Sequence, residues 1–244
     1  FPTMLSIITL FLIGGAGGLT GSLLGACILV ALIVLGVLMT FLVSRLLSAT
    51  ILKGVPSSFT LEMPPYRRPQ ILKVIVRSIV DRTLKVLGRA VISAAPAGLL
   101  IWVLANVPLS GQTTLLTALT GFLDPFARRL GMDGCILTGF LLGLPANEIV
   151  VPIIIMTYMA RGSLLEVEGV QLMQLFTANG WTWITAVSTL LFSLMHWPCA
   201  TTLLTIRKES GSLKWTLLSF LVPTVCGIIL CFLFTTAARF LFPA

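Results

Sequence analysis

Long stretches without a charged residue constrain the fold of this chain more than any other feature. Asp, Glu, Lys and Arg are absent from residues 1–44, 90–123, 170–206 and 215–238, and Glu148 is the only charge in 134–160. A helix crosses the hydrocarbon core of a bilayer in about 20 apolar residues. Only 10% of the residues are charged, whereas soluble domains have about 25%. The sequence therefore predicts an all-α, polytopic helical membrane protein and excludes a soluble globular domain.

Hydropathy and spacing divide the chain into helical segments. We expect membrane spans at about 1–13, 19–47, 90–107, 134–160, 181–205 and 213–237, and a weaker apolar helix at 112–131. Before the third span, charged residues recur at every fourth position: Lys73, Arg77, Asp81, Lys85 and Arg89. Positions four apart share one helix face, so residues 70–89 are predicted to form an amphipathic helix on the membrane surface. A solvated helix within a soluble loop is the alternative.

The net charge of +8 is explained by two cation-rich loops. Lys and Arg gather in 45–89 and again in 207–214. Such clusters mark cytoplasmic loops of membrane proteins, so the charge does not call for a nucleic-acid partner. The five cysteines lie in apolar segments without a C-x-x-C pair, which argues against a disulfide framework. Three tryptophans are expected at the membrane interface: Trp181, Trp183 and Trp197.

A carboxylate inside an apolar segment marks the first candidate site. Glu148 follows Asn147, and Pro145 and Pro152 flank the pair. An ionisable residue at membrane depth is costly and usually faces a bundle interior or a wet cavity. Proline lacks the N–H that continues a helix, and transporters place ion sites at discontinuous helices. We predict that Asn147 and Glu148 line an ion path on a Pro-broken gate helix; a protonated Glu148 bonded to a neighbouring helix is the alternative.

The second candidate site is the stretch HWPCATTLLTI at 196–206. His196, Cys199 and Thr202 are three apart and could share a helix face, while Pro198 interrupts the helix. Imidazole and thiol groups suit a borderline divalent metal such as Fe²⁺. A histidine near the end of a span is also a common interfacial residue, so spacing alone leaves both readings open. The chain has neither an H-E-x-x-H nor a G-x-S-x-G motif, so hydrolytic chemistry is poorly supported.

Four motifs, taken in order, resemble one family over essentially the whole chain. They are MPPYRRP (63–69), FLDPFARRLGMDG (122–134), GLPANEIVVP (143–152) and HWPCATTLLTIRKESGSLKW (196–215). The ordered set resembles the C-terminal part of the membrane domain of bacterial ferrous iron transport protein B. By that resemblance the chain is the second gate region of an Fe²⁺ transporter. Asn147, Glu148 and Cys199 then fall on gate motifs proposed to line the Fe²⁺ path, with His196 nearby.

The resemblance also implies parts that these 244 residues do not contain. In the family, an N-terminal GTPase domain, which uses GTP and Mg²⁺, and a first gate repeat precede this region. The chain, which starts at Phe1, is therefore expected to be a non-enzymatic fragment of a longer protein. The expected partners are Fe²⁺ as the transported ion, membrane lipid, the missing N-terminal half, small Feo-system proteins and further copies in an oligomer. The expected location is the bacterial cytoplasmic (inner) membrane, crossed several times.

Three other functions stay open at this point. Gate architecture also resembles nucleoside-recognition membrane proteins, so a nucleoside-type permease is the nearest rival. An intramembrane hydrolase that uses Glu148 and His196 is the second, and a helical scaffold without transport activity is the third. Metal-dependent flux distinguishes Fe²⁺ transport from all three.

Overall fold

Helices make up most of the described chain. The computed structural model describes residue 7 and residues 19–50, 70–110, 113–159 and 170–242. Within these ranges the chain is helical apart from turns and one short antiparallel pair of strands, β1 (Pro108–Ser110) and β2 (Thr113–Thr114), in which Pro108 pairs with Thr114. The all-α fold class is therefore confirmed. The predicted span at 1–13 lies outside the described residues except for Ile7.

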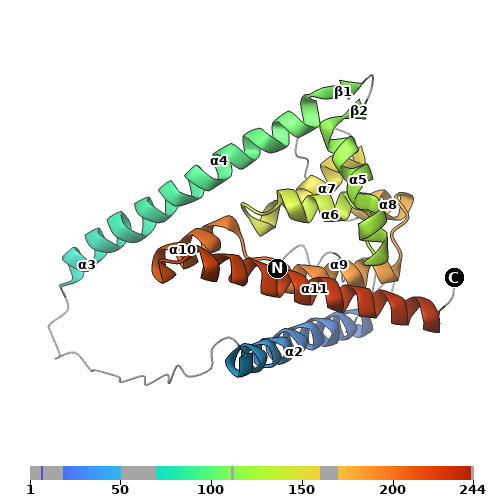
Figure 1. The fold of residues 1–244 in the computed structure, drawn as a ribbon, viewed down its shortest axis with the longest axis horizontal. Coiled ribbons are helices and arrows are strands. Elements are labelled where there is room, and N and C mark those ends of the chain that lie inside the picture. The colour runs from blue at the N-terminus through green and yellow to red at the C-terminus, as the bar shows by residue number, and fades with distance from the viewer. Residues whose placement is uncertain (1–6, 8–18, 51–69, 111–112, 160–169, 243–244) are drawn as a thin grey trace. The chain divides into compact units, whose positions relative to one another are not determined.

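The helices follow one another along the chain as Figure 1 shows. They are α2 (Leu19–Thr50), α3 (Ile71–Ser78), a π-helical turn (Ile79–Leu84), α4 (Lys85–Asn106), α5 (Leu115–Arg129), α6 (Gly134–Leu142), a 3₁₀ turn (Asn147–Ile149), α7 (Val150–Met159), α8 (Val170–Ala178), α9 (Trp183–Met195), α10 (Ala200–Ser210) and α11 (Leu213–Leu241). Three stretches of the described chain are long and apolar enough to cross a membrane: Thr20–Thr50, Trp183–Ser210 and Leu213–Leu241. These stretches support a membrane protein.

The chain divides into two compact units. One unit is Ile33–Ile92, which holds the later part of α2, all of α3, the π-helical turn and the start of α4. The other unit comprises Phe1–Leu32 and Ser93–Ala244. Both candidate sites lie in this second, larger unit.

In the smaller unit, the amphipathic segment runs without a break into the segment that follows it. The π-helical turn adjoins α3 at Ser78 and α4 at Lys85, and α4 continues to Asn106. The predicted boundary between an amphipathic helix ending at 89 and a span starting at 90 is therefore not a helix end. No residue of α3 is buried. The placement of residues 70–89 on a membrane surface stays a prediction.

In the larger unit, α11 packs along α9 through small side chains. The buried residues of α11 recur about once per turn: Gly227, Cys231, Thr235 and Ala238. Thr235 Oγ1 lies 3.2 Å from Ser188 Oγ of α9, and a Cβ at Gly227 would lie 3.3 Å from the backbone oxygen of Met195. Small residues let membrane helices approach closely. This contact places Gly227 of α11 beside the C-terminal end of α9.

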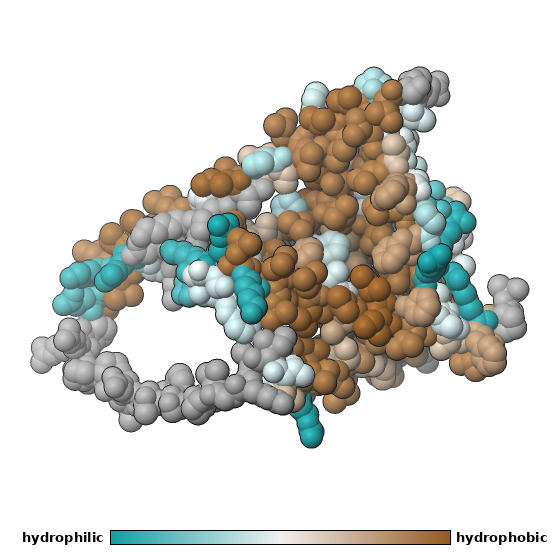
Figure 2. Space-filling view, viewed as in Figure 1, coloured by the Kyte–Doolittle hydropathy of each residue, from teal (hydrophilic) through white to brown (hydrophobic). Residues whose placement is uncertain are grey.

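The other face of α11 is apolar and exposed. Its exposed residues include Leu217, Leu221, Val225, Ile229, Phe232 and Leu233. Figure 2 shows hydrophobic residues over most of the visible face of the described chain. A helix with small buried residues on one face and large apolar residues on the other is typical of a bundle whose outer surface contacts lipid.

α6 and α7 form an antiparallel hairpin. Asp133, just before α6, contacts Tyr158 near the end of α7, and a Cβ at Gly139 would lie 2.5 Å from Ile154 Cγ1. The helices have 9 and 10 residues, which is about 14–15 Å each and half of a hydrocarbon core of about 30 Å. The sequence predicted one segment over 134–160, and its discontinuity is present. The chain, however, reverses direction at the break, so α7 runs back alongside α6 instead of continuing in the direction of α6.

The hairpin rests on α4 and α5 through a buried apolar cluster. Its members are Ile101, Ala105, Leu116, Leu142, Ile153 and Met156. The start of α6 also packs on the backbone of α5, because a Cβ at Gly134 would collide with the carbonyl oxygen of Thr120. The hairpin is therefore held on one side by apolar packing of the kind that supplies most of a fold's stability.

The predicted span 181–205 is also two helices. α9 ends at Met195 and α10 begins at Ala200, which leaves a break of four residues. The two helices together make a stretch of 28 residues, long enough to cross a bilayer. α9 packs on the C-terminal half of α11 through Ser188 and Thr235. A small apolar hollow between α10 and the first turns of α11 is lined by Leu203 and Leu217. α11 thus runs beside both helices and spans the break.

Candidate functional site

The tip of the α6–α7 hairpin is made of residues that end a helix. The N–H of Gly143 still donates to the carbonyl of Gly139 at 2.9 Å, and Pro145 follows in the turn. Proline has no N–H to donate and restricts the residue before it to extended backbone. Asn147 and Glu148 then form the 3₁₀ turn from which α7 begins. The break lies where the sequence predicted it, at Pro145.

Asn147 and Glu148 point away from the protein interior. Both side chains are exposed. In the part of the chain that the structure describes, the Glu148 carboxylate has no hydrogen bond or ion pair. The predicted ion-path role and its alternative, a bond to a neighbouring helix, both stay predictions. A carboxylate and an amide at the tip offer oxygen atoms to a ligand that reaches it.

Pro152 does not have the role that the sequence suggested. It is the third residue of α7, and the N–H groups of a first helical turn have no partner within the helix in any case. Proline is tolerated there. Pro152 therefore starts α7 and does not break it, and Pro145 shapes the tip without it.

The second break is an extended segment between α9 and α10. His196 follows the end of α9, with its N–H donating to Phe192 O at 2.7 Å and its ψ at 172°. Pro198 lies in the break, and Cys199 is the N-cap residue of α10. The Cys199 thiol lies 3.1 Å from the hydroxyl oxygen of Thr202 and 3.1 Å from that of Thr201. Cys199 and Thr202 are thus brought together as predicted.

His196 is held in one tautomer by the end of α9. Its Nδ1 lies 2.7 Å from the carbonyl oxygen of Ser193. A carbonyl only accepts, so Nδ1 carries the proton and Nε2 keeps its lone pair. The ring lies 5.3 Å from Phe140 of α6, between centroids, and 6.1 Å from Trp197. Because His196 lies before α10, it does not share a helix face with Cys199 and Thr202 as the spacing had suggested.

Two buried nitrogen atoms at this break have no hydrogen-bond partner among the described residues. They are Nε2 of His196 and Nε1 of Trp197. Leaving a buried polar atom unpaired costs about 1–3 kcal/mol, and such groups in folded proteins usually bind a water or a ligand. Trp197 is only 6% exposed and Trp181 only 5% exposed, so both side chains pack inside the protein. Their position at the membrane interface stays a prediction.

The two breaks meet through one backbone hydrogen bond. The N–H of Ala200, the first residue of α10, donates to the carbonyl of Leu144 in the hairpin tip at 2.8 Å. His196 packs on Phe140 of the same hairpin. Backbone groups that helices leave unpaired at membrane depth need such partners or a wet cavity. The structure therefore brings together the two segments that the sequence singled out.

The described residues contain no cluster of three or more His, Cys, Asp or Glu side chains that could hold a metal ion. Glu148, His196 and Cys199 lie on adjoining segments without forming such a cluster. Within the described ranges, these three side chains do not come together around one point. Ligands offered one or two at a time are the arrangement that lets an ion enter and leave.

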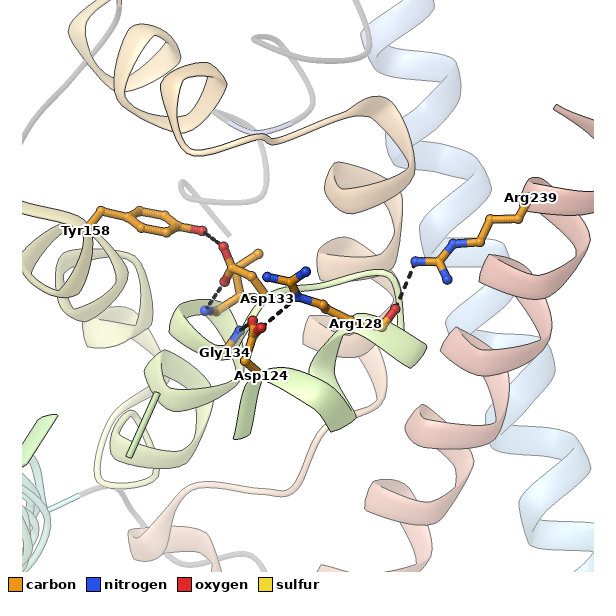
Figure 3. Close-up of polar contacts among 7 residues, drawn as sticks. Asp124, Arg128, Asp133, Gly134, Tyr158 and Arg239 are labelled. Carbon is orange, nitrogen blue, oxygen red and sulfur yellow. Dashed lines mark hydrogen bonds and ion pairs between the residues drawn. The ribbon is translucent and has the colours of Figure 1, made fainter. Parts of the chain in front are cut away.

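A hydrogen-bond chain at the other end of the hairpin was missed by sequence reasoning. The Tyr158 hydroxyl donates to Asp133 Oδ2 and accepts from Trp181 Nε1 at 2.7 Å. Figure 3 shows Tyr158 pointing at Asp133, with Gly134 held by Asp124 beside them. Asp133 just before an apolar run is a helix N-cap signal. Its tyrosine partner, 25 residues away, has no signal in the sequence.

Burial changes the acidity of the Asp133 carboxyl group. Desolvation raises its pKa above the ordinary value of 3.8, and hydrogen bonds from Tyr158 and from the N–H of Ile136 oppose this rise. The neighbouring carboxylate of Asp124 adds to it. Asp124 itself is paired with Arg128 at 2.6 Å. Because Arg128 is largely exposed, that ion pair contributes little to stability.

Two family models match the chain. Residues 29–82 match "Ferrous iron transport protein B C terminus", and residues 87–213 match "Gate: Nucleoside recognition". The second match covers more than half of the chain and includes both breaks. No solved structure matches the chain.

Curated relatives carry the name "Fe(2+) transporter FeoB". One from Staphylococcus aureus (strain MSSA476) is 30% identical over 217 residues, which is 85% of this chain and 31% of the relative. One from Synechocystis is 28% identical and covers 86% of this chain and 33% of the relative. One from Methanocaldococcus jannaschii is 25% identical and covers 93% and 34%. The chain spans about a third of the length of these relatives.

Proposed function

This chain belongs to the Gate family and carries the C-terminal segment of ferrous iron transport protein B, and from that premise we propose that it forms part of the path for Fe²⁺ uptake across the bacterial cytoplasmic membrane. The observation that carries the proposal is the hydrogen bond from Ala200 to Leu144. It joins a hairpin tip that offers a carboxylate to a break that offers a thiol. The names of the relatives support iron as the ion.

The side chains at the two breaks suit a borderline divalent cation. Glu148 and Asn147 supply oxygen atoms at the tip, and Cys199 and Thr202 supply a thiol and a hydroxyl at the break. His196 adds a nitrogen lone pair at Nε2. Mixed oxygen, nitrogen and sulfur ligands favour Fe²⁺ over hard cations such as Mg²⁺ and Ca²⁺. Pro145 and Pro198 shape the path because each lies in a break, and Pro152 has the lesser role of starting α7.

The chain works in transport and not as a catalyst in this proposal. The curated relatives are about three times as long as the matched region. This supports further parts of the same protein, including a first gate repeat and a GTP-binding domain that uses GTP and Mg²⁺. The whole protein would cross the membrane several times, contact lipid, form an oligomer and work with small Feo-system proteins.

Fe²⁺ uptake by the full-length gene product in proteoliposomes tests the proposal. Glu148→Gln keeps the side-chain volume but removes the charge at the hairpin tip. We expect uptake to fall at least about tenfold, the scale on which groups around a metal act, with insertion and yield unchanged. Glu209→Gln, which makes the same change on the exposed face of α10, is the matched control and should transport normally.

Three outcomes would contradict the proposal. Wild-type uptake by Glu148→Gln would remove the hairpin tip from the path. Nucleoside flux through the protein, inhibited by competing nucleosides and independent of Fe²⁺, would favour the nucleoside-type permease. Turnover of a peptide or lipid that depends on Glu148 and His196 would favour the hydrolase.

A further inference from the structure

The base of the α6–α7 hairpin is held by an unbroken chain of side-chain hydrogen bonds. Asp133 caps α6 by accepting the N–H of Ile136 at 2.8 Å through Oδ1. Its other oxygen accepts the hydroxyl of Tyr158, which in turn accepts Trp181 Nε1 at 2.7 Å. Trp181 is 5% exposed and stacks on Phe176 of α8 with 4.1 Å between ring centroids. The hydrogen bonds thus tie the start of α6 and the end of α7, which form the base of the hairpin, to the segment between α8 and α9.

Further contacts fix the same end. The N–H of Gly134 donates to Asp124 Oδ1 of α5 at 3.0 Å. Gly131, at a φ of +76°, brings the α5–α6 turn against α9 and α11, since a Cβ there would lie 2.5 Å from Ser188 Oγ and from Thr235 Oγ1. Arg239 of α11 donates to the carbonyl of Arg128 at 2.9 Å. Figure 3 shows Asp124 and Gly134 beside Asp133, and Arg239 reaching Arg128.

The tip is attached to the discontinuous helix in a different way. Phe140, near the tip end of α6, packs on the rings of Phe192 and His196 with centroids 4.9 and 5.3 Å apart. Among the described residues, one backbone hydrogen bond joins Leu144 to Ala200, and a donor and acceptor more than about 3.5 Å apart no longer form a hydrogen bond. α6 is about 14 Å long. A rotation of about 10° at the base would therefore move the tip by about 2 Å, enough to break the bond of 2.8 Å.

We propose that the Asp133–Tyr158–Trp181 hydrogen-bond chain is a positioning clamp, which sets where the hairpin tip and Glu148 meet the break between α9 and α10. The three residues touch no ion; they act through the hairpin. The functional consequence rests on the proposed Fe²⁺ path, whereas the placement of the tip does not. Removing one bond of the clamp would let the hairpin pivot at its base and would separate the tip from Ala200.

Disulfide formation between the tip and the break tests the clamp without iron. Leu144→Cys and Ala200→Cys are introduced together in the full-length protein after its native cysteines are replaced. Their hydrogen-bonded backbones put the two positions within the range of a disulfide. Adding Tyr158→Phe removes one hydroxyl, and we expect oxidative cross-linking to slow about fivefold. Trp181→Phe, which leaves the Tyr158–Asp133 bond in place, should slow it less.

A neighbouring hydroxyl provides the matched control. Thr157 is buried, but its Oγ1 donates to Ile153 O within its own helix. Thr157→Val should leave the cross-linking rate unchanged. Equal rates in Tyr158→Phe and its parent would overturn the clamp, as would equal slowing by Tyr158→Phe and Thr157→Val. If Tyr158→Phe does not fold, the cross-linking rates of Trp181→Phe and Thr157→Val are compared instead. Equal rates in these two variants would overturn the clamp.

Uptake kinetics then separate the clamp from the Fe²⁺ path. With native cysteines restored, Tyr158→Phe should raise the apparent KM for Fe²⁺ several-fold, because the ligands at the tip are misplaced. Slower cross-linking with an unchanged KM would keep the clamp and reject Glu148 as a path residue. If Tyr158→Phe cross-links at the parent rate and Glu148→Gln takes up Fe²⁺ at the wild-type rate, both the clamp and the role of Glu148 in the path are rejected.

Discussion

The polar groups at the two ends of the α6–α7 hairpin differ: those at the base are hydrogen-bonded to one another, and those at the tip are exposed. At the base, Asp133, Tyr158 and Trp181 satisfy one another and are largely withdrawn from solvent. At the tip, Asn147 and Glu148 are exposed, and the adjoining break holds two buried nitrogens that find no hydrogen-bond partner in the described ranges. Satisfied polar networks fix a structure, whereas unsatisfied ones persist where a ligand or water is expected. The difference supports the proposal that the base holds the hairpin in place and the tip lies on the ion path.

This contrast predicts that variants at the break lower transport more than stability, and Cys199 gives the largest expected effect. Cys199→Ser keeps a small polar group but replaces a soft ligand by a harder, weaker one. We expect Fe²⁺ uptake by the full-length protein to fall about tenfold or more, with an unchanged melting temperature.

Two other cysteines serve as controls for Cys199. Cys27 is exposed, and Cys231 is fully buried between α11 and α9, where its thiol lies 3.4 Å from the carbonyl of Ser188. Cys27→Ser and Cys231→Ser should transport close to the wild-type rate, although Cys231→Ser should lower stability. Equal uptake by all three variants would show that Cys199 is a packing residue.

The two tryptophans sharpen the contrast in stability. Trp181→Phe removes a donor that Tyr158 uses, whereas Trp197→Phe removes a buried N–H that has no acceptor among the described residues. An orphaned group costs about 1–3 kcal/mol, so Trp181→Phe should lower the free energy of unfolding while Trp197→Phe should leave it unchanged or raise it. Thermal unfolding in detergent measures both. Equal destabilisation would remove the distinction between the two ends.

If the Trp197 N–H donates to a water on the ion path in the working protein, Trp197→Phe and Trp181→Phe should also differ in their effect on transport. Trp197→Phe keeps an aromatic ring next to Phe220, whose centroid lies 5.5 Å from that of Trp197, and it loses the same volume as Trp181→Phe. We expect slower Fe²⁺ uptake without a loss of stability. A fully active Trp197→Phe would show that its N–H faces a space that nothing enters.

Much of the architecture could be predicted from hydropathy. The long uncharged runs predict helices such as α2 and α11 because lipid demands apolar side chains and internally paired backbone. Pro145 and Pro198 locate both breaks, since proline removes a backbone donor. Local chemistry determines both features, so one sequence suffices to find them.

The direction of the chain after a break could not be predicted. The helical period of a sequence shows which residues share a face of a helix. It does not show whether the chain continues in the same direction after a break, so residues 134–160 were predicted to form one span. The close packing that favours the hairpin depends on Gly139 and Gly143, whose absent side chains matter only against their partners in α7.

The candidate site could be predicted in its parts but not in its assembly. Glu148 and Cys199 stand out by residue type and setting. Their segments meet through backbone atoms of Leu144 and Ala200, and such a contact leaves no trace in side-chain identity. The clamp joins Asp133 to Tyr158 across 25 residues, a separation that no local pattern encodes.

Spacing within the hairpin is the next test of its construction. Gly139→Ala would place a methyl group 2.5 Å from Ile154 Cγ1, and overpacking of this kind costs about 1–3 kcal/mol. Gly121→Ala in α5 meets nothing within 4 Å and should stabilise by up to about 1 kcal/mol through helix propensity. Melting temperatures that shift in the same direction would show that the two hairpin helices do not pack closely.

The smallest expected effect is a pH dependence at the base. Burial raises the pKa of Asp133 above 3.8 in the folded protein, so the folded state binds the proton more tightly than the unfolded chain. The stability of the wild type should then increase as the pH falls through the raised pKa and level off below the ordinary one.

Asp133→Asn isolates this contribution because an amide is neutral at every pH and still caps α6. The charged or titratable groups around position 133 are Asp124, Arg128, Cys135 and Tyr158, and all of them remain in the variant. We expect the melting temperature of Asp133→Asn minus that of the wild type to decrease steadily from pH 7 to about pH 4. A difference that stays constant over that range would mean that Asp133 keeps an ordinary pKa, and that the base of the hairpin is wetter than its hydrogen bonds indicate.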